Sequence, residues 1–359
     1  MEMTWIEAEA PYDELILAGD AGGTNTTIAI VGRKGRTYRI MVKCRYRSAE
    51  VTDFTETVSH ALAAIKKERP FLSPSLACVS AAGPVIGNTC SLTNTSWSID
   101  GNEIERIHGF KTFIVNDFFA LSFGVPLLNR NDPKEIAVLE HPDGSCPEET
   151  GETKAVLGAG TGLGVGLLRF IEGKPVAIPS EGGHSDFAPF DEETMRLRDY
   201  VAQRIGAANP SNERFISGQG VVSIFHFFKE VKRVRMDAPL AEIDAVPDEK
   251  KPPLISKYSR SNETCADMLR LFVKMYGRYA GNVGTFFLPT GGLYVAGGIV
   301  TKDEPFFHED HRFMRYFEMN DQEGIRSVLK TIPVYIVKNY DTSLLGAAHA
   351  GASLREQNL

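Results

Sequence analysis

The chain has 359 residues, which is more than one ordinary domain usually carries, so two lobes with separate cores are expected. Apolar residues make up 43% of it and charged residues 24%, the composition of a soluble globular protein. The formal net charge of −7 and the shortness of every Lys/Arg run argue against nucleic acid or an anionic membrane as a partner. A small molecule is therefore the expected partner.

The cysteines are scattered and form no CxxC or CxC pair; they are Cys44, Cys78, Cys90, Cys146 and Cys265. This pattern predicts neither a disulfide framework nor a zinc site and favours a reducing compartment. Residues 1–14 are acidic and lack the features of a signal peptide, and no run of about 18 apolar residues could span a bilayer. We therefore expect a cytoplasmic protein.

The first third of the chain predicts an α/β lobe that opens with a strand meander. Two apolar runs flank a Gly/Thr/Asn turn within Leu15 to Val31, and residues 38–46 alternate apolar and mostly basic side chains, as a half-buried strand does. Residues 52–70 carry one apolar helical face, begin at a capping Thr or Asp and end at Pro70. The segments 75–85 and 111–117 read as buried strands, so strands alternate with a helix.

The opening pattern returns about 140 residues later, which suggests a second lobe of related topology. Residues 154–178 repeat the apolar run, the Gly/Thr turn and the second apolar run. Helices are predicted over 191–206, 220–234, 262–287 and 342–355, the last of them closing on the first lobe, and residues 291–300 predict a short buried strand with a Gly-Gly exit. Residues 235–254 are rich in proline and charge and predict a linker-like surface excursion.

The two Gly/Thr turns are the first sign of nucleotide chemistry. The sequence has no GxxxxGK[ST] motif, and Gly158 to Gly166 lacks the GxGxxG spacing of a dinucleotide fold. Two hairpin turns lined by Gly N–H groups and Thr hydroxyls could instead surround phosphate oxygens from two sides. Hairpins without a ligand are the alternative.

Asp20 ends the first of these apolar runs, beside the expected phosphates. A bare carboxylate would repel them, and a bridging Mg²⁺ would resolve the conflict because it takes carboxylate, water and phosphate oxygens together. The alternative is an aspartate that accepts hydrogen bonds from N–H groups of the turn.

Seven motifs in order give the chain a close resemblance to glucokinases of the bacterial hexokinase type, within the actin-like ATPase superfamily. They are "AGDAGGTNTTIA", "TNTSW", "VNDFFALSFGVPLL", "GAGTGLGVGLL", "SEGGHSDFAP", "NERFISGQGV" and "YVAGGIV". The resemblance implies a two-lobed actin-like ATPase (ribonuclease H-like) α/β fold, with mixed sheets flanked by helices and an active-site cleft between the lobes. The lobes would be residues 1–120 plus 341–359 and residues 121–340.

The implied activity is transfer of the γ-phosphoryl group of ATP to the 6-hydroxyl of D-glucose, the first step of glycolysis, with ATP and Mg²⁺ as cofactors. The resemblance also suggests a homodimer. It assigns the catalytic base to Asp117, which follows a predicted strand and so emerges at its carboxyl end. Read alone, "ND" is more often a turn or a helix cap.

The same resemblance supplies the remaining site residues. Sugar hydroxyls would be bound by Asn94, Asn116, Asp117, Glu181, His184 and Glu213. The nucleotide would be bound by Asp20, Gly22, Gly23, Thr24, Asn25, Gly160, Thr161, Gly162, Gly297 and Gly298, with Asp20 also holding the metal. A metal site made by Glu181 and His184 is the alternative for that pair.

Other functions stay open at this point. A nucleotide-driven conformational protein of the actin or heat-shock type would share the hairpins without needing the sugar ligands. A kinase for another hexose, or one that uses ADP or polyphosphate, would need nearly the same residues. Residues 1–14 read as an extension, and neither 129–153 nor the excursion after Arg235 matches the family pattern.

Overall fold

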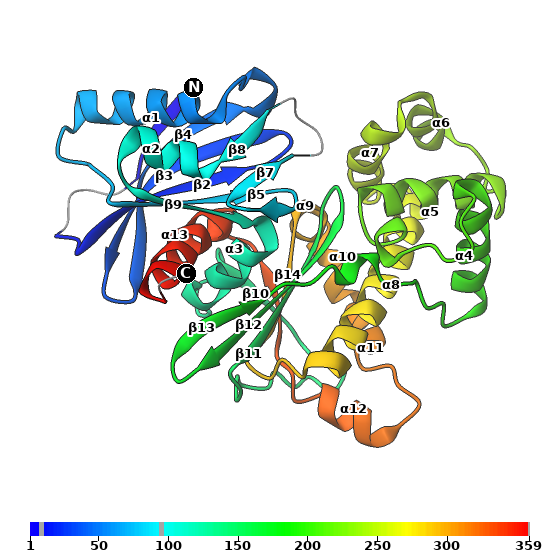
Figure 1. Ribbon diagram of the computed structural model, residues 1–359. Coiled ribbons are helices and arrows are strands. Elements are labelled where there is room, and N and C mark those ends of the chain that lie inside the picture. Colours follow the sequence, from blue (N-terminus) through cyan, green and yellow to red (C-terminus); the bar gives the residue numbers. More distant parts are fainter. Residues whose placement is uncertain (7–10, 93–96, 358–359) are drawn as a thin grey trace. The chain divides into compact units, whose positions relative to one another are not determined.

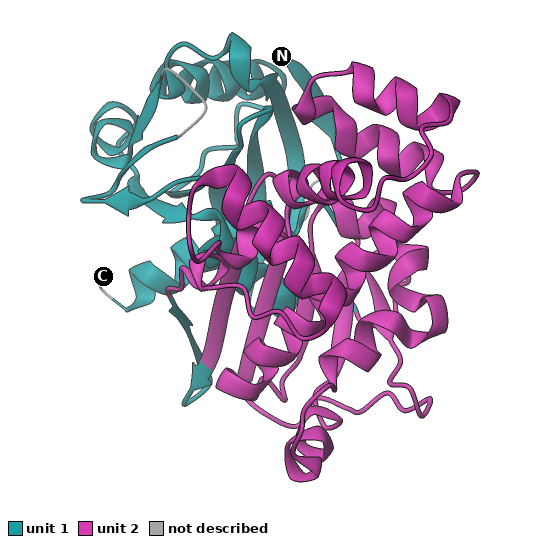
Figure 2. Ribbon diagram, turned by 90° about the vertical axis from the view of Figure 1, so that its right-hand side faces the viewer, with its two compact units in different colours: residues 1–129, 170–178, 339–359 teal, residues 130–169, 179–338 magenta. Residues whose placement is uncertain are grey.

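The computed structural model describes residues 1–6, 11–92 and 97–357, and the chain divides into two compact units (Figure 2). Unit 1 comprises residues 1–129, 170–178 and 339–359, and unit 2 comprises residues 130–169 and 179–338. Unit 1 thus takes in residues 121–129, 170–178 and 339–340 beyond the predicted first lobe. Within the described residues, no helix has the length and apolar character that crossing a membrane requires.

Unit 1 is built on a mixed sheet in the order β1-β4-β3-β2-β5-β9 (Figure 1). Its strands are β1 (Glu2–Trp5), β2 (Glu14–Ala21), β3 (Asn25–Lys34), β4 (Thr37–Arg47), β5 (Leu76–Ala81) and β9 (Lys111–Asn116). The predicted meander is confirmed, since β2, β3 and β4 pair antiparallel, while β5 and β9 run parallel to β2. A small sheet pairs β6 (Val85–Ile86), β7 (Thr89–Ser91) and β8 (Ser98–Asp100).

Helices cover both faces of the larger sheet of unit 1 (Figure 1). They are α1 (Phe54–Glu68), α2 (Gly101–His108), α3 (Asp117–Gly124) and α13 (Thr342–Glu356), with short 3₁₀ turns η1 (Ser48–Glu50) and η2 (Val125–Leu127). The carboxylate of Asp53 caps α1, as predicted, and the helix buries Phe54 and Val58 with strand residues such as Ile30. Helices α3 and α13 lie on the other face.

Helices α3 and α13 cross at two glycines, one at the end of α3 and one in the first half of α13. A Cβ on Gly346 would overlap the carbonyl oxygen of Ala120 and lie 2.7 Å from the nitrogen of Gly124. A Cβ on Gly124 would likewise overlap the carbonyl oxygen of Thr342. Because backbone atoms cannot give way as a flexible side chain does, the crossing admits no side chain at either glycine.

We expect Gly346→Ala to lower the free energy of unfolding of unit 1 by about 1–3 kcal/mol, the usual effect of overpacking. Urea denaturation followed by circular dichroism measures it as a lower midpoint. Gly324→Ala is the matched control, because a Cβ there meets no atom within 4 Å. Equal midpoints for Gly346→Ala and the unchanged chain would show that the crossing is looser than described.

Unit 2 contains most of a second mixed sheet, in the order β10-β15-β14-β11-β12-β13. Its strands are β10 (Ile136–Leu139), β11 (Thr153–Ala159), β12 (Leu163–Ile171), β13 (Lys174–Ile178), β14 (Leu293–Ala296) and β15 (Val334–Val337). The division between units runs through β12, so β13 is counted with unit 1. The β11–β12 hairpin, predicted from the second Gly/Thr turn, is confirmed by antiparallel pairing of Ala159 with Leu163.

The helices of unit 2 form a large apolar core with this sheet. They are α4 (Glu192–Ile205), α5 (Gly218–Glu230), α6 (Ala238–Ala245), α7 (Lys251–Tyr258), α8 (Glu263–Phe287), α9 (Gly298–Lys302), α10 (Glu304–His308), α11 (Arg312–Phe317) and α12 (Glu323–Leu329). Short 3₁₀ turns are η3 (Gly182–His184), η4 (Asn212–Arg214), η5 (Asp248–Lys250) and η6 (Glu309–His311). The predicted helices over 191–206, 220–234 and 262–287 correspond to α4, α5 and α8.

The prediction of a linker-like excursion over 235–254 is wrong, because this segment contains α6 and the start of α7. Pro239, Pro252 and Pro253 lie in the first turns of these helices, where a missing N–H costs nothing, Pro247 lies between the two helices, and Asp237 caps α6. Leu240, Ile243 and Ile255 are fully buried.

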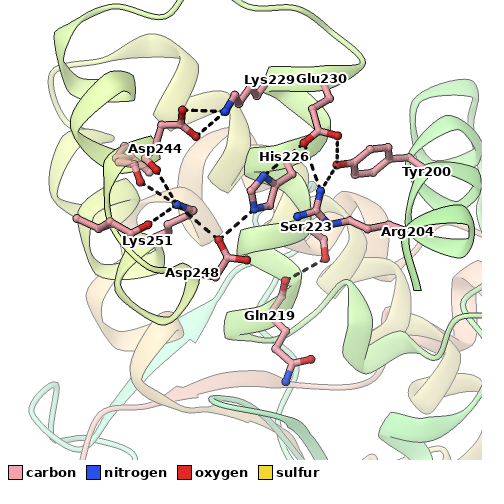
Figure 3. Close-up of polar contacts among 12 residues, drawn as sticks. Tyr200, Arg204, Gln219, Ser223, His226, Lys229, Glu230, Asp244, Asp248 and Lys251 are labelled. Carbon is pink, nitrogen blue, oxygen red and sulfur yellow. Dashed lines mark hydrogen bonds and ion pairs between the residues drawn. The ribbon is translucent and has the colours of Figure 1, made fainter. Parts of the chain in front are cut away.

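Polar contacts also hold this segment in place (Figure 3). Lys251 donates to the carbonyl oxygens of Ile243 and Asp244, and Lys229 of α5 pairs with Asp244 at 2.7 Å. The excursion is therefore a packed part of unit 2.

Candidate active site

The carboxyl ends of three neighbouring parallel strands gather the polar residues of unit 1. In the strand register, Asp20 of β2 lies opposite Ser80 of β5, and Ala81 lies opposite Asn116 of β9. Asp117 follows directly as the first residue of α3. The structure thus brings Asp20, Asn116 and Asp117 to one edge of the sheet, which is where α/β proteins place reactive groups.

Asp20 is held by hydroxyl groups from two distant parts of the chain. The hydroxyl of Ser343, on α13, donates to Oδ1 of Asp20 at 3.3 Å, and the hydroxyls of Ser343 and Ser80 lie 3.2 Å apart. Burial raises the pKa of Asp20, these hydroxyls lower it, and the nearby charge of Asp341 raises it further. A carboxylate whose charge is disfavoured by burial gains from a cation, so its chemistry suits Mg²⁺.

Asn116 and Asp117 start α3, and their side chains are partly engaged there. Oδ1 of Asn116 accepts from the N–H groups of Phe118 at 2.9 Å and Phe119 at 3.4 Å, so Asn116 is the helix cap that "ND" suggests when read alone. Its amide group donates to the carbonyl oxygen of Gly83 at 3.4 Å.

Asp117 is half-buried, and its Oδ1 accepts from the N–H of Phe118 at 2.9 Å. Burial raises the pKa of Asp117 to about 6, and the charge of Asp20 adds to this effect. Such a carboxylate is ionised at neutral pH and yet takes up a proton more readily than an exposed aspartate does, as a general base requires.

The turn that joins β2 to β3 holds the predicted residues Gly22, Gly23, Thr24 and Asn25. Gly22 N–H donates to the carbonyl oxygen of Asn25 at 3.1 Å, while Ser48 binds the carbonyl oxygens of Gly22 and Thr24. The carbonyl oxygens of Gly22, Thr24 and Asn25 are therefore hydrogen-bonded, while the residues Gly23 and Thr24 are exposed. Asn94, predicted as a sugar ligand, lies outside the described residues.

In unit 2, the second Gly/Thr turn and the Gly-Gly exit of β14 lie at one edge of the sheet. Gly160 N–H donates to the carbonyl oxygen of Gly162 at 2.9 Å, and Gly160 and Thr161 are exposed. β14 runs parallel to β11, with Ala296 opposite Gly158. Gly297 has φ +112° and no room for a Cβ beside Ala159, whereas Gly298 faces open space.

The predicted sugar ligands of unit 2 lie on two adjoining 3₁₀ turns. Glu181 directly precedes η3 and His184 is its last residue; both side chains are exposed, and their carboxylate and imidazole lie 3.8 Å apart. Glu213 lies on η4, which is joined to the η3 segment through a β-bridge between Asp186 and Ser211. Oε2 of Glu213 accepts from the N–H of Leu163 at 3.0 Å.

Over the described part of the chain, no group of three or more His, Cys, Asp or Glu side chains is placed to hold a metal ion. The pair Glu181 and His184 therefore lacks the protein ligands of a dedicated metal site. Asp20 differs, because Mg²⁺ on a kinase takes its other ligands from water and phosphate.

Sequence reasoning missed the residues that hold the candidate site together. Ser343 is 323 positions from Asp20, and Leu163 binds Glu213 through its backbone. Only the hydroxyl-rich "TS" at the start of the last helix could have hinted at the first of these. The second contact could not be predicted, because every residue except proline has a backbone N–H and the sequence does not show which one binds Glu213.

The chain is similar to known proteins over nearly its whole length. The model of a family described as Glucokinase matches residues 17–354. A relative named Glucokinase from Nostoc punctiforme is 34% identical over 357 residues, which cover 95% of this chain and 99% of the relative.

Solved structures show the same fold. A glucokinase from an Antarctic psychrotroph matches with a TM-score of 0.79 at 23% identity, over 94% of this chain and 99% of that one. A ROK family glucokinase from Streptomyces griseus, solved with glucose and AMPPNP, matches with a TM-score of 0.62 at 18% identity, over 94% and 99%. The predicted fold class, an α/β fold of the actin-like ATPase type, is confirmed.

Proposed function

This chain belongs to the glucokinase family of ATP-dependent sugar kinases, and on that premise we propose that it transfers the γ-phosphoryl group of ATP to the 6-hydroxyl of D-glucose. The observation that carries the proposal is the pair of half-buried carboxylates, Asp20 on β2 and Asp117 just after β9, at the same edge of the unit 1 sheet, where β5 lies between the two strands. Phosphoryl transfer to a sugar needs one acid to hold a cation and a second to take a proton.

Asp117 is the proposed base. Its other oxygen, Oδ2, would accept the proton of the 6-hydroxyl while Oδ1 stays on the N–H of Phe118. The start of α3 fixes the direction of the carboxylate, and the raised pKa makes it a better proton acceptor. Asn116, whose oxygen caps α3 and whose amide group donates to Gly83, would offer its second amide N–H to the sugar.

Asp20 would hold Mg²⁺ through its carboxylate, with Ser343 fixing one of the two oxygens. When bound, the ion would neutralise charge on the β- and γ-phosphate oxygens. The two Gly/Thr turns, residues 22–25 and 160–162, would donate backbone N–H groups to those oxygens, apart from the N–H groups of Gly22 and Gly160, which are bonded within the turns. The open space at Gly298, beside Gly297, would accept the adenosine.

Glu181, His184 and Glu213 are the residues of unit 2 that would bind sugar hydroxyls; for Asn94, which lies outside the described residues, the same role rests on the family resemblance alone. A carboxylate accepts and an imidazole can donate, which matches hydroxyl groups that do both. The S. griseus ROK family structure, solved with glucose and AMPPNP, supports glucose and ATP as the ligands proposed for this chain. A homodimer, suggested by the family resemblance, and a cytoplasmic location, expected from the cysteine pattern and the N-terminal sequence, remain parts of the proposal.

The assay that tests this function is ADP formation across a panel of hexoses, with and without Mg²⁺. We expect glucose to give the highest kcat/KM, and activity to vanish without a divalent cation. A higher kcat/KM for mannose, fructose or an N-acetylated hexose would show that the proposed substrate is wrong but would still support phosphoryl transfer to a hexose. A rate of ATP hydrolysis that no sugar changes, or assembly of the chain into larger species when ATP is added, would favour an actin-like conformational protein instead.

The raised pKa of Asp117 sets the expected pH dependence. The base acts only when ionised, so kcat/KM for glucose should be flat at neutral pH and fall as the pH drops below about 6, with a slope of one proton. Initial rates between pH 5 and pH 8, at constant ionic strength, measure this limb. A midpoint near the ordinary aspartate value of 3.8 would contradict the burial described for Asp117.

A further inference from the structure

Three segments of unit 2 that the proposed function assigns to different ligands form one hydrogen-bonded block. They are the phosphate turn, residues 160–163; the sugar loop, residues 181–186; and the Glu213 segment, residues 211–218. The phosphate turn meets the Glu213 segment where Gly218 N–H donates to the carbonyl oxygen of Gly160 at 2.8 Å. The sugar loop meets it where Asn212 N–H donates to the carbonyl oxygen of Ser185 at 2.9 Å.

Leu163, the last residue of the phosphate turn, contacts both the Glu213 segment and the sugar loop. Its N–H donates to Oε2 of Glu213 at 3.0 Å. Its carbonyl oxygen lies so close to Gly183 that a Cβ on this glycine would overlap it. A change in the Glu213 carboxylate therefore acts directly on the backbone that leaves the turn.

Gly162 leaves the space that the Glu213 carboxylate occupies. A Cβ on Gly162 would lie 2.5 Å from Oε2 of Glu213, the same oxygen that binds Leu163. The hydroxyl of Ser217 donates to the carbonyl oxygen of Glu213 at 2.6 Å and fixes the backbone beneath the side chain. The backbone is thus held, and the half-buried carboxylate is the part that can move.

We propose that Glu213 is a positioning residue that couples glucose binding to nucleotide binding through the N–H of Leu163. Glucose donates a hydroxyl hydrogen bond to the carboxylate and removes its other rotamers, which fixes Leu163 and with it the phosphate turn. Nucleotide phosphate bound to the turn would in the same way fix Leu163 and so orient the Glu213 carboxylate for the sugar. Coupling between two ligands is reciprocal, so nucleotide raises the affinity for glucose by the same factor. This inference rests on the proposed function and adds a contact through which binding of one substrate changes the affinity for the other.

The test measures dissociation constants for Mg²⁺·AMPPNP by isothermal titration calorimetry, without glucose and at saturating glucose. The coupling is the ratio of the two constants. We expect glucose to tighten AMPPNP binding about 5–150-fold in the unchanged chain, the usual range for coupled sites. Gly162→Ala pushes the carboxylate off Leu163, and we expect it to bring the ratio close to one. Any direct effect of the methyl group on phosphate binding is present in both constants and cancels.

Gly160→Ala is the matched control. It adds the same methyl group to the same turn, but its Cβ meets no atom within 4 Å; because Gly160 is itself a proposed nucleotide contact, both dissociation constants can rise, but their ratio should equal that of the unchanged chain. Glu213→Gln is the second variant, which keeps the shape but weakens the charge-assisted hydrogen bond, and it should give an intermediate ratio. AMPPNP binding without glucose shows that each variant is folded.

The coupling is overturned if Gly162→Ala keeps the ratio of the unchanged chain, or if that chain itself gives a ratio of one. Failure of the proposed function looks different, because the unchanged chain would then bind AMPPNP but show no heat with glucose alone or with AMPPNP present.

Discussion

Replacing Asp117 with asparagine is expected to lower kcat by about 10²–10⁴-fold, the contribution of a general base, which is roughly 3–5 kcal/mol in the barrier. The dissociation constant for glucose should change little. Asparagine has the same shape and its oxygen can still accept from Phe118 N–H, so the start of α3 is kept. What is lost is the oxygen able to take a proton from the 6-hydroxyl.

Steady-state kinetics with glucose, together with calorimetric glucose binding, separate the two effects. Asp53→Asn is the matched control, because Asp53 caps α1 through the N–H of Glu56 and asparagine caps helices equally well. Its kcat should equal that of the unchanged chain. Near-normal turnover by Asp117→Asn would remove this residue from the mechanism.

The second large effect is expected for Asp20→Asn. Substitutions of groups that merely support a metal ligand typically cost 10–100-fold in metal affinity or activity, so loss of the proposed ligand itself should raise the Mg²⁺ requirement by at least about 100-fold. An amide oxygen can still accept from Ser343 but brings no negative charge to balance the ion. Glucose binding in the absence of nucleotide should be unchanged.

Rates measured against free Mg²⁺ at constant ATP give this requirement. Asp341→Asn is the comparison variant, since its charge also acts on Asp20 but its carboxylate is paired with Lys43 at 2.8 Å. We expect it to shift the Mg²⁺ requirement far less than Asp20→Asn does. If both variants shifted the Mg²⁺ requirement equally, Asp20 would contribute only negative charge near the ion and would not be a direct Mg²⁺ ligand.

Most of the fold was predictable because its signals are local. The meander of β2, β3 and β4 follows from alternating side chains and Gly-containing turns, and α1 and α4 begin at the aspartates that cap them. The failure over 235–254 has a physical cause: proline breaks a helix in its interior but is tolerated in the first turn, and the sequence alone does not say which case applies.

The candidate site was predictable only where strand ends present side chains. Asp20 and Asp117 each end or follow a buried strand, and the parallel register brings them to one sheet edge. The contacts that support them join distant residues, such as Ser343 with Asp20. Those contacts depend on tertiary packing, which a single sequence does not reveal.

The most direct test of the central claim is a single-turnover reaction with ATP labelled in its γ-phosphoryl group, glucose and Mg²⁺, compared between the unchanged chain and Asp117→Asn. We predict that the unchanged chain places the label on the 6-position of glucose and that Asp117→Asn does so at least about 100-fold more slowly. Label found in free phosphate, on another position of the sugar, or on glucose at equal rates in both proteins would contradict the account.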